Sequence, residues 1–191
     1  MNVCLYGASS TDLAQEYYDA AYALGTLLAQ HGHTLVYGGG AQGVMGAAAR
    51  GAHDHGGKIV GIAPSFFDVK GILYQHCTEF IYTETMQERK KIMMERSDAF
   101  IMAPGGIGTF EEFFEILTLK QLGRINPAIA VFSVAGYYDA LQTLLEQTVQ
   151  QGFAKPACLQ IYRTFEKADE VVAYIEHFDP TAFDVRHLKN I

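Results

Sequence analysis

Three short segments combine glycine, acidic, basic and hydroxyl residues at spacings that could bind and cleave an anionic ligand. Two are glycine-rich loops, Tyr37–Gly46 and Pro104–Glu112, each following an apolar run and leading into a helical pattern. Glycine lets the backbone turn sharply and approach a ligand, and N–H groups at the start of a helix bind anions such as phosphate. The third segment, Thr85–Lys91, carries Arg89 and Lys90. Together they predict an anion site flanked by charged side chains.

The first loop holds five glycines in the nine residues from Gly38 to Gly46. It is not a Walker loop, because it lacks the ending Gly-Lys-Ser/Thr, and it does not match the register of a dinucleotide fingerprint. Two interpretations stay open at this point. The glycines either bring N–H groups to an anion, or they allow a tight turn and close packing of helix on sheet.

The second loop offers successive N–H groups, from Gly106 to Thr109, that could cradle a phosphate. We expect Thr109 to cap the following helix, and Thr109-x-x-Glu112 has the spacing of a capping box. Glu112 then either folds back onto the backbone of Thr109 or faces the ligand. A carboxylate repels a phosphate, so a ligand-facing Glu112 would make sense beside a developing cation.

The third segment contains another capping-box spacing, Thr85-x-x-Glu88, which predicts a helix that starts there. Arg89 and Lys90 then fall in the first turns, where cations oppose the helix dipole. They form either a solvated basic face or part of a functional site.

Elements that would position these segments alternate along the whole chain as short apolar runs and helical patterns. Strands are predicted at Val3–Tyr6, Thr34–Tyr37, Ile59–Ala63, Glu79–Tyr82, Ala99–Ala103, Ile129–Phe132 and, on a weaker signal, Leu159–Tyr162. Helices are predicted over Asp12–Gln30, 43–55, 86–96, 110–122, 137–151 and 166–177. This alternation predicts an α/β fold with a doubly wound parallel sheet in a single domain, residues 1–178, followed by a tail, 179–191. Ligands of such sheets bind at the carboxyl ends of the strands. The segment Phe66–Thr78 should lie near that edge, although it matches no motif.

Composition excludes several classes of protein. The 191 residues are 49% apolar and 18% charged, which is typical of a globular domain. The net charge of −7, with no basic patch, argues against nucleic acid as a partner. No apolar run approaches the roughly 18 residues of a membrane span, so we expect no membrane association. Three widely separated cysteines, Cys4, Cys77 and Cys158, indicate thiols in a reducing compartment and predict a cytoplasmic protein.

Some conspicuous residues have ordinary explanations. Two His-x-His pairs, His31/His33 and His53/His55, fall beside glycine at helix ends, and we interpret them as polar helix termini, with no metal site predicted. An apolar stripe follows Pro104–Glu112 and predicts core or a dimer seam; it comprises Phe110, Phe113, Phe114 and Leu117. A Schiff-base lysine needs a desolvated environment, and no sequence context suggests one for Lys58, Lys70, Lys120 or Lys155.

In this order and spacing, the motifs resemble those of the LOG family of cytokinin riboside 5′-monophosphate phosphoribohydrolases, also catalogued as "lysine decarboxylase-like". Pro104 to Glu112 matches the family's P-G-G-x-G-T-x-x-E. Tyr37 to Gly46 matches Y-G-G-G-x-x-G-[LV]-M-G, and Gly7-Ala8-Ser9 matches the opening G-[SA]-S. Met86, Arg89 and Lys90 match M-x-x-R-K, and the resemblance covers roughly residues 1–153.

The resemblance implies a Rossmann-like homodimer with sites near the interface. It also implies cofactor-free hydrolysis of the N-glycosidic bond in N6-modified adenosine monophosphates, releasing the base and ribose 5-phosphate. Arg89 and Glu112 would then be catalytic. The substrate-binding residues it implies are Ser9, Gly38, Gly39, Gly40, Gly43, Met45, Lys90, Gly105, Gly106, Ile107, Gly108 and Thr109. Two alternatives stay open: a nucleotide- or cofactor-binding carrier like the molybdenum-cofactor carriers, and a hydrolase whose substrate is plain AMP.

Overall fold

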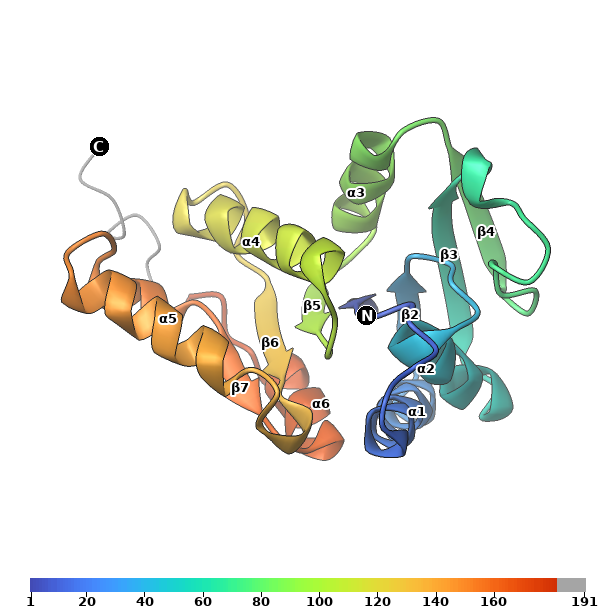
Figure 1. Cartoon of the computed structure of the whole chain (residues 1–191), viewed down its shortest axis with the longest axis horizontal. Helices are drawn as coiled ribbons and strands as arrows, with labels where there is room; N and C mark the ends of the chain where they lie inside the picture. The colour runs from blue at the N-terminus through green and yellow to red at the C-terminus, as the bar shows by residue number, and fades with distance from the viewer. Residues whose placement is uncertain (182–191) are drawn as a thin grey trace.

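A single sheet of seven parallel strands forms the centre of the molecule in the computed structural model, which describes residues 1–181 (Figure 1). The strands are β1 (Asn2–Tyr6), β2 (Thr34–Tyr37), β3 (Lys58–Pro64), β4 (Glu79–Thr83), β5 (Ala99–Met102), β6 (Ala128–Phe132) and β7 (Arg163–Phe165). Their order across the sheet is β4-β3-β2-β1-β5-β6-β7. The doubly wound parallel sheet predicted from the sequence is therefore confirmed.

The first six strands lie within about one residue of their predicted positions, but the seventh prediction is wrong. The apolar run Leu159–Tyr162 is not a strand. A 3₁₀ helix, η3, occupies Pro156–Gln160, and Ile161 and Tyr162 turn into the core. The seventh strand, β7, begins directly after this run, at the edge of the sheet. Its residues are mostly polar and do not alternate between polar and apolar clearly enough for a sequence pattern to detect the strand.

Within residues 1–181, six α-helices cover both faces of the sheet, five of them between strands and α6 after the last one (Figure 1). They are α1 (Gln15–Gln30), α2 (Gly43–Asp54), α3 (Met86–Glu95), α4 (Ile107–Gln121), α5 (Asp139–Gln150) and α6 (Ala168–Glu176), with two further 3₁₀ turns, η1 (Ser65–Phe67) and η2 (Val134–Gly136). All six were predicted, but α1 begins three residues after the predicted Asp12 and α4 begins three residues before the predicted residue 110.

Two apolar cores result, one on each face of the sheet. Successive residues of a strand point to opposite faces, so in β1 the side chains of Val3 and Leu5 pack with α1, α2 and α6. Cys4 and Tyr6 pack on the other face with α3, α4 and α5. Burial on both faces explains why these strands read as continuous apolar runs.

The helices α1 and α2 pack with almost no side chain between them. A β-carbon on Gly25 of α1 would lie 2.0 Å from the carbonyl oxygen of Ala48 in α2, and one on Gly51 would lie 2.1 Å from that of Tyr22. Only glycine allows this separation, so these glycines fix where α2 and the loop preceding it lie against the sheet.

The strand order reverses between β1 and β5, which run side by side and lead to helices on opposite faces. The loops after these two strands are joined where the Ala8 N–H donates to the Pro104 carbonyl, at 3.0 Å. Loops that diverge in this way leave a crevice at the carboxyl edge of a parallel sheet. No helix within residues 1–181 is long and apolar enough to cross a membrane. Of the predicted tail, residues 182–191 lie outside the described residues.

Candidate active site

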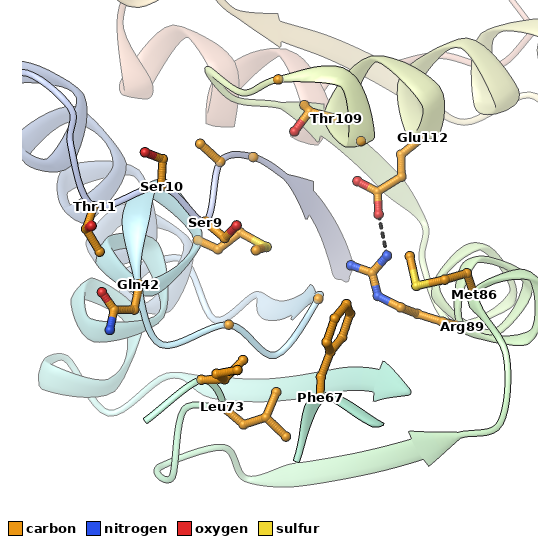
Figure 2. A pocket seen from close by; sticks show the side chains of 18 of the residues that line it. Ser9, Ser10, Thr11, Gln42, Phe67, Leu73, Met86, Arg89, Thr109 and Glu112 are labelled. Atoms are coloured by element: carbon orange, nitrogen blue, oxygen red, sulfur yellow. Dashed lines mark hydrogen bonds and ion pairs between the residues drawn. The ribbon is translucent and has the colours of Figure 1, made fainter. Parts of the chain in front are cut away.

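A cavity of about 970 Å³ opens at this crevice, at the carboxyl ends of β1, β2, β3 and β5. Its walls come from the loop 7–11 after β1, the glycine loop after β2, the segment 67–73 after β3, and the starts of α3 and α4. Figure 2 shows Arg89 and Glu112 at one end, with Ser10, Thr11 and Gln42 at the other. The sequence segments singled out for chemistry thus converge on one site.

The N-terminus of α4 forms one wall of the cavity. Gly106 is its N-cap residue, and Gly106, Gly108 and Thr109 all line the cavity. The first N–H groups of a helix have no partner within it, so this turn presents donors and a positive dipole end to a ligand. An anionic group is the ligand that such a wall favours.

The predicted capping role of Thr109 is wrong, and so is the interpretation that Glu112 folds back onto the backbone of Thr109. The helix starts three residues before the predicted position, so Thr109 lies in its first turn and is 96% buried, with its hydroxyl packed over Gly105. Glu112 does not fold back onto the Thr109 backbone but reaches across to Arg89. By contrast, the helix start predicted at Thr85 is confirmed, because its hydroxyl accepts from the Glu88 N–H at 3.1 Å; the Glu88 carboxylate accepts from the N–H of Glu84 at 2.9 Å, one residue before the cap.

Two tyrosines that sequence reasoning missed hold the loop before α4. The hydroxyl of Tyr138 is buried and donates to the carbonyl of Ala103, and that of Tyr137 donates to the carbonyl of Gly105, both at 2.8 Å. They follow β6, on the neighbouring strand of the sheet. A pair of adjacent tyrosines after a strand is a signal that could have identified them.

A buried ion pair between Arg89 and Glu112 is the chemical centre of the cavity. Nη1 of Arg89 donates to Oε1 of Glu112 at 2.6 Å (Figure 2), and Nε donates to the carbonyl of Ile62 in β3 at 3.1 Å. Both side chains are only 7% exposed although both line the cavity. The guanidinium is therefore fixed by two elements, and the carboxylate by the guanidinium.

Burial raises the pKa of Glu112 above its ordinary value, and the adjacent Arg89 opposes that shift. A buried carboxyl group with a raised pKa beside a fixed cation is typical of acid–base and electrostatic catalysis. The pair can stabilise a positive charge on one side and a negative charge on the other.

The glycine loop after β2 forms the tight turn and close packing that its glycines allow, and its binding of an anion stays a prediction. Gly38 and Gly40 line the cavity, and a β-carbon on Gly38 would lie 2.1 Å from Nη2 of Arg89, so the missing side chain makes room for the guanidinium. Gly39 and Gly43 have positive φ values of 74° and 63° and pack against Phe80 and the backbone of residues 8–10. These two glycines serve the turn and helix packing.

Lys90 does not line the cavity, and its side chain contacts α4. Its ammonium group contacts the carboxylates of Glu111 and, at 3.0 Å, Glu115. These partners raise the pKa of Lys90, with Glu111 the larger cause. Since Glu111 itself lines the cavity, Lys90 holds a rim residue in place, and its predicted contact with substrate stays a prediction.

Most of the predicted site residues are thus brought together. Those that line the cavity are Ser9, Gly38, Gly40, Met45, Arg89, Gly106, Gly108, Thr109 and Glu112. Those that do not are Gly39, Gly43, Lys90, Gly105 and Ile107. Ile107 is 87% exposed. Sequence reasoning missed the polar lining residues Ser10, Thr11 and Gln42. It also missed the apolar lining residues Phe67, Ile72 and Leu73, which belong to the segment 66–78 that matches no motif.

Lys120 lies in an environment that its sequence context does not indicate. Lys120 is 2% exposed, and burial lowers its pKa to about 8. Its ammonium group donates to the carbonyl of Pro127 at 2.5 Å and lies 4.4 Å from the centre of the Phe178 ring. It does not line the cavity, so its unusual environment is not that of a Schiff-base lysine in this site.

Comparison with known proteins gives a consistent family. Residues 45–175 match the family model described as "Possible lysine decarboxylase". The chain is 35% identical over 178 residues to the cytokinin riboside 5′-monophosphate phosphoribohydrolase LOG2 of Arabidopsis thaliana, covering 93% of this chain and 84% of that protein. It is 37% identical to LOG5 of the same plant (93% and 78% covered) and 35% identical to the probable enzyme LOGL5 of Oryza sativa subsp. japonica (98% and 76% covered).

Solved structures share the fold at lower identity. The molybdenum cofactor carrier protein of Chlamydomonas reinhardtii superposes with a TM-score of 0.72 at 20% identity, covering 95% of this chain and 98% of that chain. The molybdenum cofactor binding protein of Rippkaea orientalis gives 0.70 at 21% identity, covering 92% and 94%. At these identities the likeness shows a common Rossmann-like architecture. With the sequence relatives, the matched family model and the motifs gathered at one cavity, the chain belongs to the LOG family.

Proposed function

We propose that the cavity hydrolyses the N-glycosidic bond of adenosine 5′-monophosphates, including N6-modified ones, and releases the free base and ribose 5-phosphate. The observation that carries the proposal is the buried Arg89–Glu112 pair in the same cavity as the N-terminus of α4. Its relatives named as cytokinin riboside 5′-monophosphate phosphoribohydrolases support it.

The 5′-phosphate fits the N-terminus of α4. N–H groups of the first turn, together with the Thr109 hydroxyl, supply donors for phosphate oxygens where the helix dipole favours a negative charge. Binding the phosphate there fixes the ribose relative to Glu112, which lies one turn further along the same helix. Binding energy remote from the broken bond would then serve the chemical step, so a bare nucleoside should be a poor substrate.

Glycosidic cleavage develops positive charge on the ribose in an oxocarbenium-like transition state. The Glu112 carboxylate stabilises that charge and accepts the proton of the attacking water. Water oxygen bonds to the ribose carbon as its bond to the purine nitrogen breaks, and the bonding electrons leave with the purine. The purine takes up a proton from solvent and Glu112 returns the proton of the attacking water to solvent, so no net proton is gained or lost. Arg89 stays protonated, so it offsets charge on the departing base and does not act as an acid.

The purine fits the apolar side of the cavity. Phe67, Leu73 and Met86 line it, and Phe67 and Met86 lie next to Arg89 (Figure 2). These side chains offer a surface on which a flat base and an apolar N6 substituent can pack. Whether the physiological substrate carries such a substituent is the first question for experiment.

Parallel incubations with isopentenyladenosine monophosphate, AMP and the unphosphorylated riboside, following free base by chromatography, test the proposal. We expect release from the modified monophosphate, little from the riboside, and a loss of about 10²–10⁴-fold in Glu112→Gln. Equal or greater release from AMP would keep the chemistry and assign the protein to purine salvage. Binding of nucleotide with no release from any of the three would favour a carrier.

The geometry of Arg89 gives a second test. Arg89→Lys keeps the positive charge but cannot donate to Ile62 and Glu112 together, because lysine lacks the planar array of donors. We expect this variant to lose most of its activity while remaining folded. Full activity would mean that charge alone suffices.

We also propose that the protein is a cytoplasmic homodimer. All three cysteines are free thiols, which suits a reducing compartment. A second copy would cover an apolar surface on and between α4 and α5, where Phe114 is 37%, Leu144 54% and, beyond α5, Phe153 87% exposed. Light scattering of the wild type and of Phe153→Asp checks this: a dimer that becomes a monomer supports the assignment.

A further inference from the structure

Two histidines and a glutamate from distant parts of the sequence meet at the edge of the sheet opposite the cavity. His31 ends α1, and His33 immediately precedes β2, so both lie at the amino ends of the strands. Glu176 is the last residue of α6. The cavity lies at the carboxyl ends, so this cluster is separate from the proposed catalytic centre.

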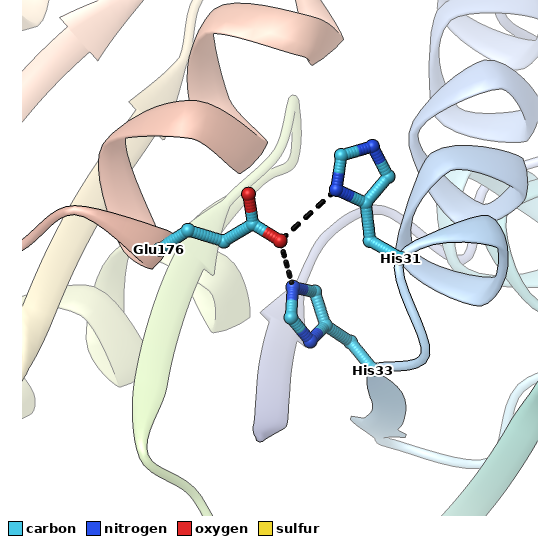
Figure 3. Close-up of side chains that lie close together, drawn as sticks. All are labelled: His31, His33 and Glu176. Carbon is cyan, nitrogen blue, oxygen red and sulfur yellow. Dashed lines mark hydrogen bonds and ion pairs between the residues drawn. The ribbon is translucent and has the colours of Figure 1, made fainter.

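The three side chains point at one another (Figure 3). Nδ1 of His31 lies 3.0 Å and Nε2 of His33 lies 2.9 Å from the same carboxylate oxygen, Oε1 of Glu176. All three atoms lie within 4.8 Å of one another. The sequence-based interpretation of His31 and His33 as merely polar helix termini did not anticipate their shared carboxylate.

We propose that His31, His33 and Glu176 form a binding site for a divalent transition-metal ion of the Zn²⁺ type. The donor set decides the class of ion, because two imidazole nitrogens and one carboxylate oxygen suit zinc and its neighbours, whereas Mg²⁺ and Ca²⁺ prefer oxygen ligands alone. Two histidines and a glutamate with one open position is also a known arrangement of zinc ligands.

The observed distances are close to those that a metal would impose. In a tetrahedral site with bonds of about 2.0–2.1 Å, the ligand atoms lie about 3.3 Å apart. The two nitrogen–oxygen distances here, 3.0 and 2.9 Å, need only a few tenths of an ångström of expansion, whereas the two nitrogens, which lie within 4.8 Å of each other, must approach by up to about 1.5 Å. Side-chain rotation of His31, which is 44% exposed, can supply the remaining adjustment.

Burial and neighbours define how the ion would enter. His33 is 8% exposed and is held in place, whereas the exposed faces of His31 and Glu176 leave room for the ion and a water as fourth ligand. The amino group of Met1 lies 3.5 Å from Nδ1 of His33, so Nε2 is the nitrogen left for the metal. Any affinity tag should therefore be placed at the C-terminus and removed before the titration.

Bound metal would reinforce a connection that the contacts of His31 and His33 with Glu176 already make. Glu176 lies 143 residues from His33 and 145 from His31, so the ion would attach α6 to the turn between α1 and β2. An ion that binds only the folded chain stabilises it in proportion to the logarithm of its concentration. The proposed site would therefore contribute to the stability of the fold.

The second His-x-His pair provides a matched control. His55 bonds to the carbonyl of Gly51 at 3.0 Å, and the ring of His53 packs against that of His76. Neither histidine shares a carboxylate with the other, and within residues 1–181 only the cluster around Glu176 brings three such donors together.

Zinc titration of metal-stripped, untagged protein tests the proposal, by calorimetry for stoichiometry and by thermal unfolding for stability. We expect one Zn²⁺ per chain and a rise of about 5–10 °C in Tm when free Zn²⁺ exceeds its Kd about 100-fold. Both should disappear in His31→Gln/His33→Gln and in Glu176→Gln, and both should persist in His53→Gln/His55→Gln.

Glu176→Gln keeps the test independent of folding, because its amide oxygen still accepts hydrogen bonds from the two imidazoles. Visible absorption of Co²⁺ bound in place of zinc reports the coordination geometry directly. No Tm rise in the wild type, or a rise that survives both Glu176→Gln and His31→Gln/His33→Gln, would overturn the proposal. So would a rise that depends on His53 and His55 instead.

Discussion

Replacing Gly38 by alanine should damage catalysis through a residue that it does not replace. The new β-carbon would lie 2.1 Å from Nη2 of Arg89, whereas ordinary contacts begin at 3.4 Å. The guanidinium must therefore retreat by about 1.3 Å, away from the position where it donates to Glu112 at 2.6 Å. A misplacement of this size costs about 10²-fold in rate, which corresponds to about 2.7 kcal/mol in the barrier.

The assay is kcat/KM for release of free base, with the fold checked by thermal unfolding. A double-variant cycle isolates the cause. If Gly38→Ala acts by displacing Arg89, it should have little further effect in an Arg89→Ala background, because the group that it pushes is gone. Moving the Arg89 guanidinium away from Glu112 should also raise the pKa of Glu112 further. The acid limb of the pH–rate profile of Gly38→Ala should therefore lie at higher pH than that of the wild type.

Two results would refute this reasoning. One is a Gly38→Ala enzyme within about threefold of wild-type kcat/KM, which would show that the guanidinium moves without consequence. The other is an unchanged effect of Gly38→Ala in the Arg89→Ala background, which would mean that the β-carbon disturbs the loop and not the ion pair.

Three other properties follow from the structure. In the wild type, catalysis needs the Glu112 carboxylate, whose pKa is raised, so kcat/KM should fall on acidification at a pH above the ordinary value for glutamate; a limb at or below pH 4 would contradict this. Lys120, with a pKa of about 8, binds its proton less tightly in the folded chain than in the unfolded chain. The free energy of unfolding of the wild type, relative to that of Lys120→Met, should therefore rise by about 2 kcal/mol from pH 7 to 10, as measured by urea unfolding. Gly25→Ala, whose β-carbon would lie 2.0 Å from the Ala48 carbonyl oxygen, should destabilise the fold by about 1–3 kcal/mol, and an unchanged urea midpoint would show that the helices can separate without cost.

Sequence patterns predicted the sheet well because burial on both faces leaves a local signature. In β1 every residue from Val3 to Tyr6 is apolar, since both of its faces meet helices. The edge strand β7, Arg163–Phe165, is too short and too polar to leave such a signature. The neighbouring apolar run was therefore mistaken for it.

The candidate site was predicted in part, for a related reason. The N-cap at Thr85 depends on residues three apart and could be predicted locally. The partner of Glu112 could not, because Arg89 is on another helix and the contact exists only once β4 and β5 are placed on either side of β3, β2 and β1. Motifs singled out the two residues, but their ion pair and burial required the fold.

The same ion pair has a consequence for how this chain could change over time. Holding two charges out of water is expensive, and a pair of apolar side chains of similar volume is often no less stable in such a position. Natural proteins keep such arrangements where activity is under selection, at some cost in stability. A descendant that no longer needed the reaction could replace Arg89 and Glu112 together by apolar residues, and its fold would be as stable as before or more stable. Within this family, a copy that retains the glycine loops but has apolar residues at both positions would therefore be a candidate for a scaffold that has been released from catalysis.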